Sequence, residues 1–262
     1  MDKETFYSEH WRKIEPERIQ RYEAMFQWRE ENVRTLQSLA LGVGNRVLDY
    51  GSGPGFLALG VADIVGTKGS VTGVDINAQF VEDANRRAAS YDNVDFHLLR
   101  DEAIPLTDVS VDRVVCKNVL EYVPSVERTL TELYRVLEPE GRILVIDSDW
   151  GFVLVEPWSM LETRRFFEAA GPAFREPNIG RKLSGLLKKA GFTDVKVEIK
   201  ARADLTGGGL AVLRNMQSYG DTFGTLPKSE SSKLLEVVEE AVATGEYLFC
   251  LPQFIVSAVR PK

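Results

Sequence analysis

The chain has 262 residues, 44% hydrophobic and 27% charged, which suits one large α/β domain and excludes a disordered or fibrous protein. Its net charge of −7 disfavours a nucleic-acid partner, because such a partner is held through clustered Lys and Arg. No apolar run approaches the ~20 residues that span a bilayer, and the charged start does not resemble a signal peptide. We therefore expect a cytoplasmic protein with no membrane span.

The first segment, residues 1–42, is predicted to form a helical lid. Apolar residues recur there at three- and four-residue spacing from Tyr22 to Ala40, and Glu15-Pro16 is expected to separate two helices. From Arg46 onward, short β-rich runs alternate with helical segments, which is typical of a parallel sheet. These runs are RVLDY, SVTGVDI, VDFHLL, DRVVCKN, RILVID and FTDVKVEI. They predict a cofactor-binding core over 43–200.

A helical segment over 201–246 separates this core from its last strand, and we expect it to cap an acceptor pocket. Residues 247–262 then supply the last strand, through the apolar run that begins at Tyr247. Together the elements predict a single domain over 1–262. Its fold is expected to be α/β and Rossmann-like, with a seven-stranded, mostly parallel sheet and helices on both faces.

The sharpest motif is a glycine-rich turn between a strand and a helix, VLDYGSGPGFL at residues 47–57. Without Cβ atoms, Gly51, Gly53 and Gly55 let the chain bend tightly and approach a ligand, while the next helix begins with free N–H groups. A dinucleotide fingerprint, G-x-G-x-x-G, would need glycine where Phe56 stands. The spacing thus disfavours a nicotinamide-dependent oxidoreductase, which stays an alternative beside a catalytically silent nucleoside-binding protein.

Acidic residues follow the next two strands. Asp75 ends the second strand, where its carboxylate can accept both hydroxyls of a ribose or simply cap the following helix. Asp101 follows the third strand, where it can accept a hydrogen bond from the exocyclic amine of adenine, with Glu102 and Ala103 beside it. Since the carboxyl ends of parallel strands meet at one edge, these residues predict a nucleoside site.

Through these motifs the chain resembles the class I S-adenosylmethionine-dependent methyltransferases, in particular the group similar to ubiquinone and menaquinone biosynthesis enzymes. The resemblance spans about residues 16–200 and is carried by VLDYGSGPG, VTGVDIN, RDEAIPLTDVSVDRVVCKNVLEYV and LYRVLEPEGRILVID. It implies S-adenosyl-L-methionine as the cofactor. It also implies methyl transfer to O, N, C or S of a small molecule, by an in-line displacement that depends mainly on alignment.

The resemblance further implies individual cofactor contacts. Gly51, Gly53 and Gly55 would border the methionine and ribose, and Asp49 would organise the methionine amino group, unless it only stabilises the turn. The other implied contacts lie at strand ends and in the lid, where an N-terminal residue often contacts the cofactor carboxylate. They are Asp75, Ile76, Asp101, Glu102, Ala103, Asn118 and Val119 at the strand ends, and Tyr22, Arg29 or Arg21 in the lid.

Acceptor chemistry is expected beyond the fifth strand and in the lid. Asp149 could orient or deprotonate an amine, hydroxyl or phenol, and His10 lies in an aromatic segment that either covers the cofactor or packs against the core. Nearby aromatic residues either wall the acceptor or belong to the core. They are Tyr7, Trp11, Trp150, Trp158 and Tyr219. No metal-ligand spacing occurs, so no metal is expected, and a monomer or a homodimer is equally open.

Overall fold

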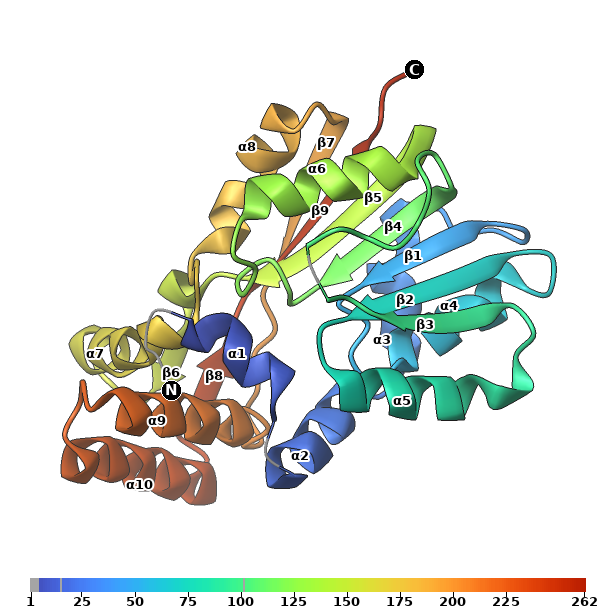
Figure 1. The fold of residues 1–262 in the computed structure, drawn as a ribbon. Helices are drawn as coiled ribbons and strands as arrows, with labels where there is room; N and C mark the ends of the chain where they lie inside the picture. The colour runs from blue at the N-terminus through green and yellow to red at the C-terminus, as the bar shows by residue number, and fades with distance from the viewer. Residues whose placement is uncertain (1–4, 15, 101) are drawn as a thin grey trace.

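The computed structural model describes residues 5–14, 16–100 and 102–262, and for residues 16–18, 20 and 21 only the backbone. A seven-stranded sheet with the order β3-β2-β1-β4-β5-β9-β7 forms its centre (Figure 1). Strand β9 is antiparallel to β5 and β7, and the other neighbouring pairs are parallel. The strands are β1 (Arg46–Tyr50), β2 (Ser70–Asp75), β3 (Val94–Leu98), β4 (Val111–Lys117), β5 (Leu137–Ser148), β7 (Thr193–Lys200) and β9 (Gln253–Val259).

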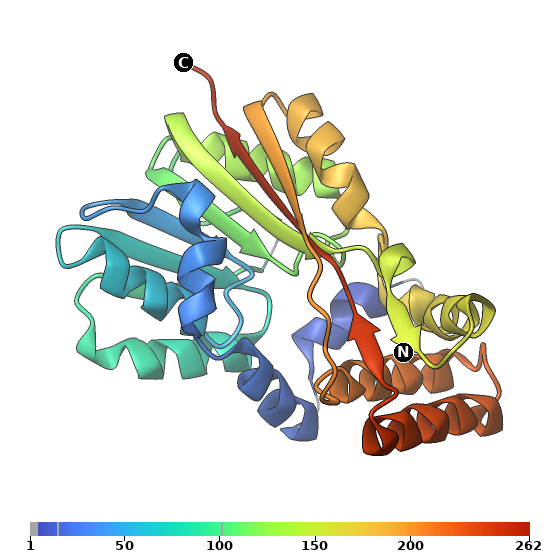
Figure 2. The same cartoon turned by 180° about the vertical axis from the view of Figure 1, so that it is seen from behind.

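Helices cover both faces of this sheet, as the two opposite views show (Figures 1 and 2). On one face lie α4 (Phe56–Val65), α5 (Ala78–Arg87) and the 3-10 turn Gln37–Leu39. On the other lie α6 (Val126–Val136) and α8 (Ile179–Lys189). The predicted Rossmann-like α/β fold is confirmed.

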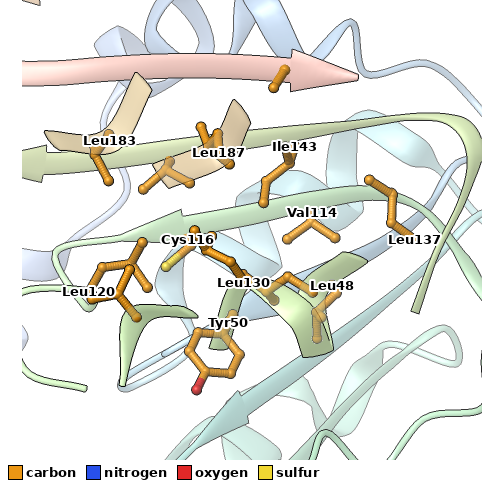
Figure 3. Packing of buried hydrophobic residues seen from close by; sticks show 14 of the residues in the cluster. Leu48, Tyr50, Val114, Cys116, Leu120, Leu130, Leu137, Ile143, Leu183 and Leu187 are labelled. Atoms are coloured by element: carbon orange, nitrogen blue, oxygen red, sulfur yellow. The ribbon is translucent and has the colours of Figure 1, made fainter. Parts of the chain in front are cut away.

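Helix α6 illustrates how the sequence forms these layers. The side chain of Ser125 accepts a hydrogen bond from the backbone N–H of Arg128, which caps the first turn. Leu130 and Leu133 lie on one helical face and are fully buried against β4 and β5. Figure 3 shows Leu130 in the same cluster as Val114 of β4 and Ile143 of β5. Burying each leucine stabilises the fold by about 2 kcal/mol.

A second hydrophobic core lies beyond the carboxyl ends of the parallel strands, and we call the elements around it the cap (Figure 1). The cap consists of β6 (Leu154–Glu156), α7 (Met160–Ala170), α9 (Leu210–Phe223), α10 (Lys228–Thr244) and β8 (Leu248–Cys250). Strands β6 and β8 pair with each other, outside the main sheet. The cap therefore takes residues from both sides of β7, whereas the sequence predicted it from 201–246 alone.

The predicted last strand is split into two. Strand β8 pairs with β6 in the cap and β9 lies in the main sheet, because Pro252 lies between them and has no N–H for a sheet ladder. The prediction of a single strand from Tyr247 onward was therefore wrong. The assignment of 1–262 to one domain, with 43–200 as its core, stays a prediction.

The N-terminal segment forms more helices than predicted: α1 (Phe6–Arg12), α2 (Pro16–Phe26) and α3 (Glu30–Thr35). Proline at the first position of α2 suits a helix start, since its missing N–H would have no partner there. Phe6 of α1 belongs to the core of the cap, whereas Leu39 after α3 packs against the main sheet. The helices of this segment therefore lie in the position of a lid, whereas the 3-10 turn Gln37–Leu39 belongs to the layer that covers the main sheet. In the part of the chain that is described, every helix is too short or too polar to cross a bilayer.

Candidate functional site

The glycine-rich turn after β1 is held by backbone hydrogen bonds to β2. The N–H groups of Gly51 and Ser52 donate to Val74 O at 2.8 and 3.0 Å. Gly51 has φ +74°, and a Cβ there would lie 2.2 Å from Val119 Cγ2, so only glycine fits without displacing the chain. An open space lies above the turn, on the side that Gly51 and Gly53 line.

That space is a cavity with about 1230 Å³ of empty volume, part of it open to solvent. The carboxyl ends of β1, β2 and β4 form its floor, and α1, α2 and α3 supply its roof through Trp11, Arg12, Phe26 and Asn32. Nine of the residues predicted for cofactor or acceptor line it. They are Trp11, Asp49, Gly51, Gly53, Asp75, Ile76, Glu102, Asn118 and Val119.

Five buried polar atoms around this cavity have no hydrogen-bond partner among the described residues. Such groups cost about 1–3 kcal/mol each when they stay unsatisfied, so they mark the place of a polar ligand. They come from the lid, from the glycine-rich turn and from the ends of three strands. The atoms are Trp11 Nε1, Asp49 Oδ2, Ser52 Oγ, Glu102 Oε1 and Asn118 Oδ1.

Asp75 anchors the turn and faces the same cavity. One carboxylate oxygen accepts from Gly53 N and the other from Asn77 N, both at 2.8 Å. Each oxygen has a further lone pair, so the carboxylate can still accept from a ligand hydroxyl. Burial raises the pKa of Asp75, while these backbone hydrogen bonds oppose the rise. Glu102 lies nearby, with Oε2 held by Arg128 at 2.7 Å and Oε1 unpaired.

Two charged side chains lie at the other end of the cavity, on β1 and β4. Asp49 is buried, and this burial together with the neighbouring charge of Asp75 raises its pKa to about 7. Lys117 ends β4 and lines the same cavity, and burial lowers its pKa. Next to it, Asn118 adopts φ +55°, an uncommon conformation for a residue with a side chain, which is typical of functional sites.

Several predicted cofactor residues do not line the cavity. Gly55 begins α4, and a Cβ there would lie 2.8 Å from both Ala84 and Phe96, so its glycine serves helix packing instead of ligand approach. Arg29 is exposed at the start of α3, and Ala103 is exposed on the loop after β3. Asp101 and the side chain of Arg21 lie outside the described residues.

A hydrogen-bonded cluster joins the lid to the cap. Tyr219 of α9 lies 3.1 Å from His10 Nε2 of α1, and Tyr22 of α2 lies 3.4 Å from both groups. All three side chains are buried, and Phe6 stacks on the His10 ring at 5.2 Å. Of the two expectations for His10, the structure shows the packing one, since the ring packs against the cap and His10 is not among the residues that line the cavity. The Trp11 ring contacts the rings of His10 and Tyr22 in this cluster. Trp11 also lines the cavity and so connects the cluster to it.

Asp149 does not face the cavity, contrary to the prediction of an acceptor-binding acid. Its oxygens accept from Arg181 Nε and Nη2, each at 2.6 Å, and one also accepts from Gly151 N at 3.0 Å. The carboxylate is fully buried. With both oxygens engaged in a bidentate ion pair, Asp149 holds the loop after β5 against α8.

The other predicted acceptor aromatics also lie away from the cavity. Trp158 is buried in the cap and donates from Nε1 to Leu234 O at 2.9 Å. Trp150 donates to Glu121 Oε2 at 2.7 Å, and Tyr7 lies under Arg175. All three aromatic residues therefore serve packing. The sequence could not show this, because aromatic residues of a pocket wall and of a core have the same sequence pattern.

Sequence reasoning missed many residues of the site region, and four of them have polar side chains that bear on its chemistry. Lys117 and Ser52 line the cavity. Lys117 could have been found as a charged last residue of an apolar strand, and Ser52 as a polar residue inside the glycine-rich turn. Tyr122 lines the cavity as well, 5.0 Å from the Trp11 ring. Glu121 lies buried behind Tyr122, where desolvation and the nearby Asp147 raise its pKa well above the usual range. No local pattern distinguished these two from helix-surface residues.

Comparison with known proteins identifies the family. The sequence matches the family described as methyltransferase domain over residues 41–171, half of the chain. The chain belongs to this methyltransferase family. The predicted resemblance to class I S-adenosylmethionine-dependent methyltransferases is thereby confirmed, as are the enzyme class and the cofactor.

Individual relatives agree with this assignment. The methyltransferase is 37% identical to an arsenite methyltransferase of Halobacterium salinarum over 41% of its own length and 28% of that protein. It is 31% identical to a demethylmenaquinone methyltransferase of Symbiobacterium thermophilum, over 58% of its length and 62% of that protein. The chain thus spans less than two thirds of these relatives.

A solved structure shares the fold. It is a phosphoethanolamine N-methyltransferase of Haemonchus contortus in complex with phosphomonomethylethanolamine and S-adenosylhomocysteine. The TM-score is 0.66 at 18% identity, and the match covers 100% of this methyltransferase and 61% of that chain. The shared sheet and helix layers support the fold, whereas the acceptor must be argued from the cavity itself.

Proposed function

We propose that the chain transfers a methyl group from S-adenosylmethionine to a small planar acceptor, such as a hydroxyaromatic or quinol. The single observation that carries the cofactor half is the ring of five unpaired polar atoms around a cavity at the carboxyl ends of β1, β2 and β4. A nucleoside with an amino-acid tail matches their chemistry, because hydroxyls and amino groups can donate to the acidic oxygens. When bound, the cofactor supplies an electrophilic methyl group.

The residues that would hold the cofactor fall into three groups. Asp75 would accept the ribose hydroxyls, and Glu102 and Ile76 would lie along the base, with one carboxylate oxygen of Glu102 still unpaired. Gly51 and Gly53 allow close approach of the turn. Asp49 would accept from the amino group of the methionine part. The buried walls exclude water, which strengthens each of these charged contacts.

The acceptor half rests on the aromatic roof. The Trp11 ring lies 4.9 Å from Tyr22 and 5.0 Å from Tyr122, and its Nε1 has no partner among the described residues. Trp11 and Tyr122 line the cavity, so a planar acceptor could stack on their rings and accept a hydrogen bond from Trp11 Nε1. In such a reaction the residues mainly align the acceptor and exclude water, since the displacement itself needs little covalent help.

Calorimetry and a transfer assay test this proposal. We expect S-adenosylhomocysteine to bind the purified protein and NADH not to bind. Binding of NADH without S-adenosylhomocysteine would instead favour an oxidoreductase. With labelled S-adenosylmethionine, hydroxyaromatics should be methylated in preference to aliphatic amines and arsenite. Cofactor binding without transfer to any acceptor class would leave a silent nucleoside-binding protein.

Localisation and assembly are predicted from the sequence alone. The cytoplasmic location and the absence of a nucleic-acid partner stay predictions, and a monomer and a homodimer both stay open. Sedimentation of the purified chain would decide the oligomeric state.

A further inference from the structure

The geometry points to Lys117 as the residue that binds the carboxylate of the amino-acid part of the cofactor, opposite Asp49, which would bind its ammonium group. This inference rests on the proposed function and adds to it the residue that contacts the cofactor carboxylate. The sequence had placed the carboxylate contact on the lid, at Tyr22, Arg29 or Arg21. Lys117 was not among the predicted site residues.

The sheet register places Asp49 and Lys117 side by side. Asp49 of β1 pairs with Val115 of β4, and Lys117 lies two residues further along the same strand. Side chains two residues apart in a strand project from the same face, so Asp49 and Lys117 share the α4 face of the sheet. Both line the cavity. An acid and a base thus lie together at the carboxyl ends of adjacent parallel strands.

Lys117 has no counterion of its own. In the described ranges 5–14, 16–100 and 102–262, no carboxylate oxygen lies within 4.0 Å of its Nζ. Burial lowers its pKa, and the positive charges of Arg29 and Lys200 act in the same direction, while the negative charges of Asp49 and, less strongly, Glu31 oppose them. Lys117 is partly buried, and an ammonium group without a counterion is unfavourable in such a place, so its retention here suggests an anionic ligand.

A smaller pocket extends the positive region beyond Lys117. Lys117, Asn32 and Leu57 line both this pocket and the main cavity, and Lys200 lines the smaller one. Glu31 also lies there, but Arg202 pairs with it at 2.6 Å. The potential at the junction is therefore dominated by lysines, which suits a carboxylate.

The lid residues predicted for this contact are less suitable. The Tyr22 hydroxyl lies within the buried cluster with His10 and Tyr219, and Tyr22 does not line the cavity. Arg29 is exposed at the start of α3. Of the described cations, Lys117 and Arg12 line the cavity, and Lys117 is the one beside Asp49.

The test compares three ligands by calorimetry. S-adenosylhomocysteine carries both the ammonium and the carboxylate, S-adenosyl-3-thiopropylamine lacks only the carboxylate, and 5′-methylthioadenosine lacks both. Lys117→Met should weaken S-adenosylhomocysteine by about 10- to 100-fold, as expected for a lost charge-assisted hydrogen bond, and leave the other two ligands within about twofold. Lys117→Arg should restore most of the affinity. Lys189→Met, an exposed lysine of α8, is the matched control and should change nothing.

The outcomes distinguish a failure of the role of Lys117 from a failure of the proposed function. Equal weakening of all three ligands by Lys117→Met, or no weakening of S-adenosylhomocysteine, would overturn the role of Lys117 and leave the proposed function standing. Failure of the unmodified protein to bind any of the three would overturn the proposed function itself. Binding of 5′-methylthioadenosine by Lys117→Met also shows that the variant is folded.

Discussion

Replacing Asp49 by Asn should make the ligand-free protein more stable and its cofactor binding weaker. Burial raises the pKa of Asp49 from its ordinary 3.8 to about 7, so the folded protein holds this proton more tightly than the unfolded chain. Ionising Asp49 therefore lowers the free energy of unfolding. This loss grows as pH rises from about 4 to about 7 and is constant above that. At 1.36 kcal/mol for each pKa unit, the cost reaches up to about 4 kcal/mol at pH 8 and about 2 kcal/mol at pH 5.

Urea unfolding measures this difference, with the four tryptophans as fluorescent reporters. Asp49→Asn should exceed the original protein in free energy of unfolding, and the excess should grow between pH 5 and pH 8. The comparison isolates Asp49 from Asp147, whose pKa burial also raises to about 7, because Asp147 is present in both proteins. Asp92→Asn, at an exposed turn, is the control and should stay within about 0.5 kcal/mol.

The same variant should bind S-adenosylhomocysteine at least tenfold more weakly, because the neutral amide cannot provide a charge-assisted contact to the ammonium group. Stability gained where affinity is lost is typical of a functional site. An Asp49→Asn protein that is no more stable at pH 8 than the original, or whose stability difference does not change with pH, would refute the reasoning.

Four further substitutions test other parts of the site. Asp75→Ala should weaken S-adenosylhomocysteine at least tenfold in calorimetry, and unchanged affinity would remove it from the ribose site. Gly51→Ala should lower the free energy of unfolding by about 2 kcal/mol and abolish measurable cofactor binding, because its Cβ would lie 2.2 Å from a neighbouring side chain. Gly53→Ala, whose Cβ meets nothing nearer than 3.9 Å, should be milder, and equal losses would contradict this. Asp149→Asn should lower Tm through its broken ion pair and leave kcat unchanged; a lower kcat at unchanged Tm would return it to the acceptor site.

Local patterns predicted the cofactor floor well, because its geometry depends on neighbours in the sequence. Gly51 and Gly53 lie in a turn whose conformation is set within a few residues, and Asp75 ends a strand whose alternation was clear. The seven-stranded, mostly parallel sheet follows from the same short-range signals and from right-handed crossovers, whereas the order of its strands was not predicted.

Long-range packing decided the residues that the sequence placed wrongly. Asp149 is held by Arg181, 32 positions away, and Trp158 by Leu234, 76 positions away. Gly55 looked identical to the ligand-facing glycines until the positions of Ala84 and Phe96 were known. Lys117 was overlooked because a lysine at a strand end is ordinary unless its neighbour across the sheet is a buried acid.

The short connection between β8 and β9 has a consequence for the order of events during turnover. Only Leu251 and Pro252 join the cap strand to the main sheet, and β8 is also paired with β6, which follows β5 closely. The cap can therefore swing by little, whereas α1 and α2 are fixed mainly by their side chains. We therefore expect entry of the proposed cofactor and release of its demethylated product to depend on α1 and α2, which line the cavity, and not on movement of the cap.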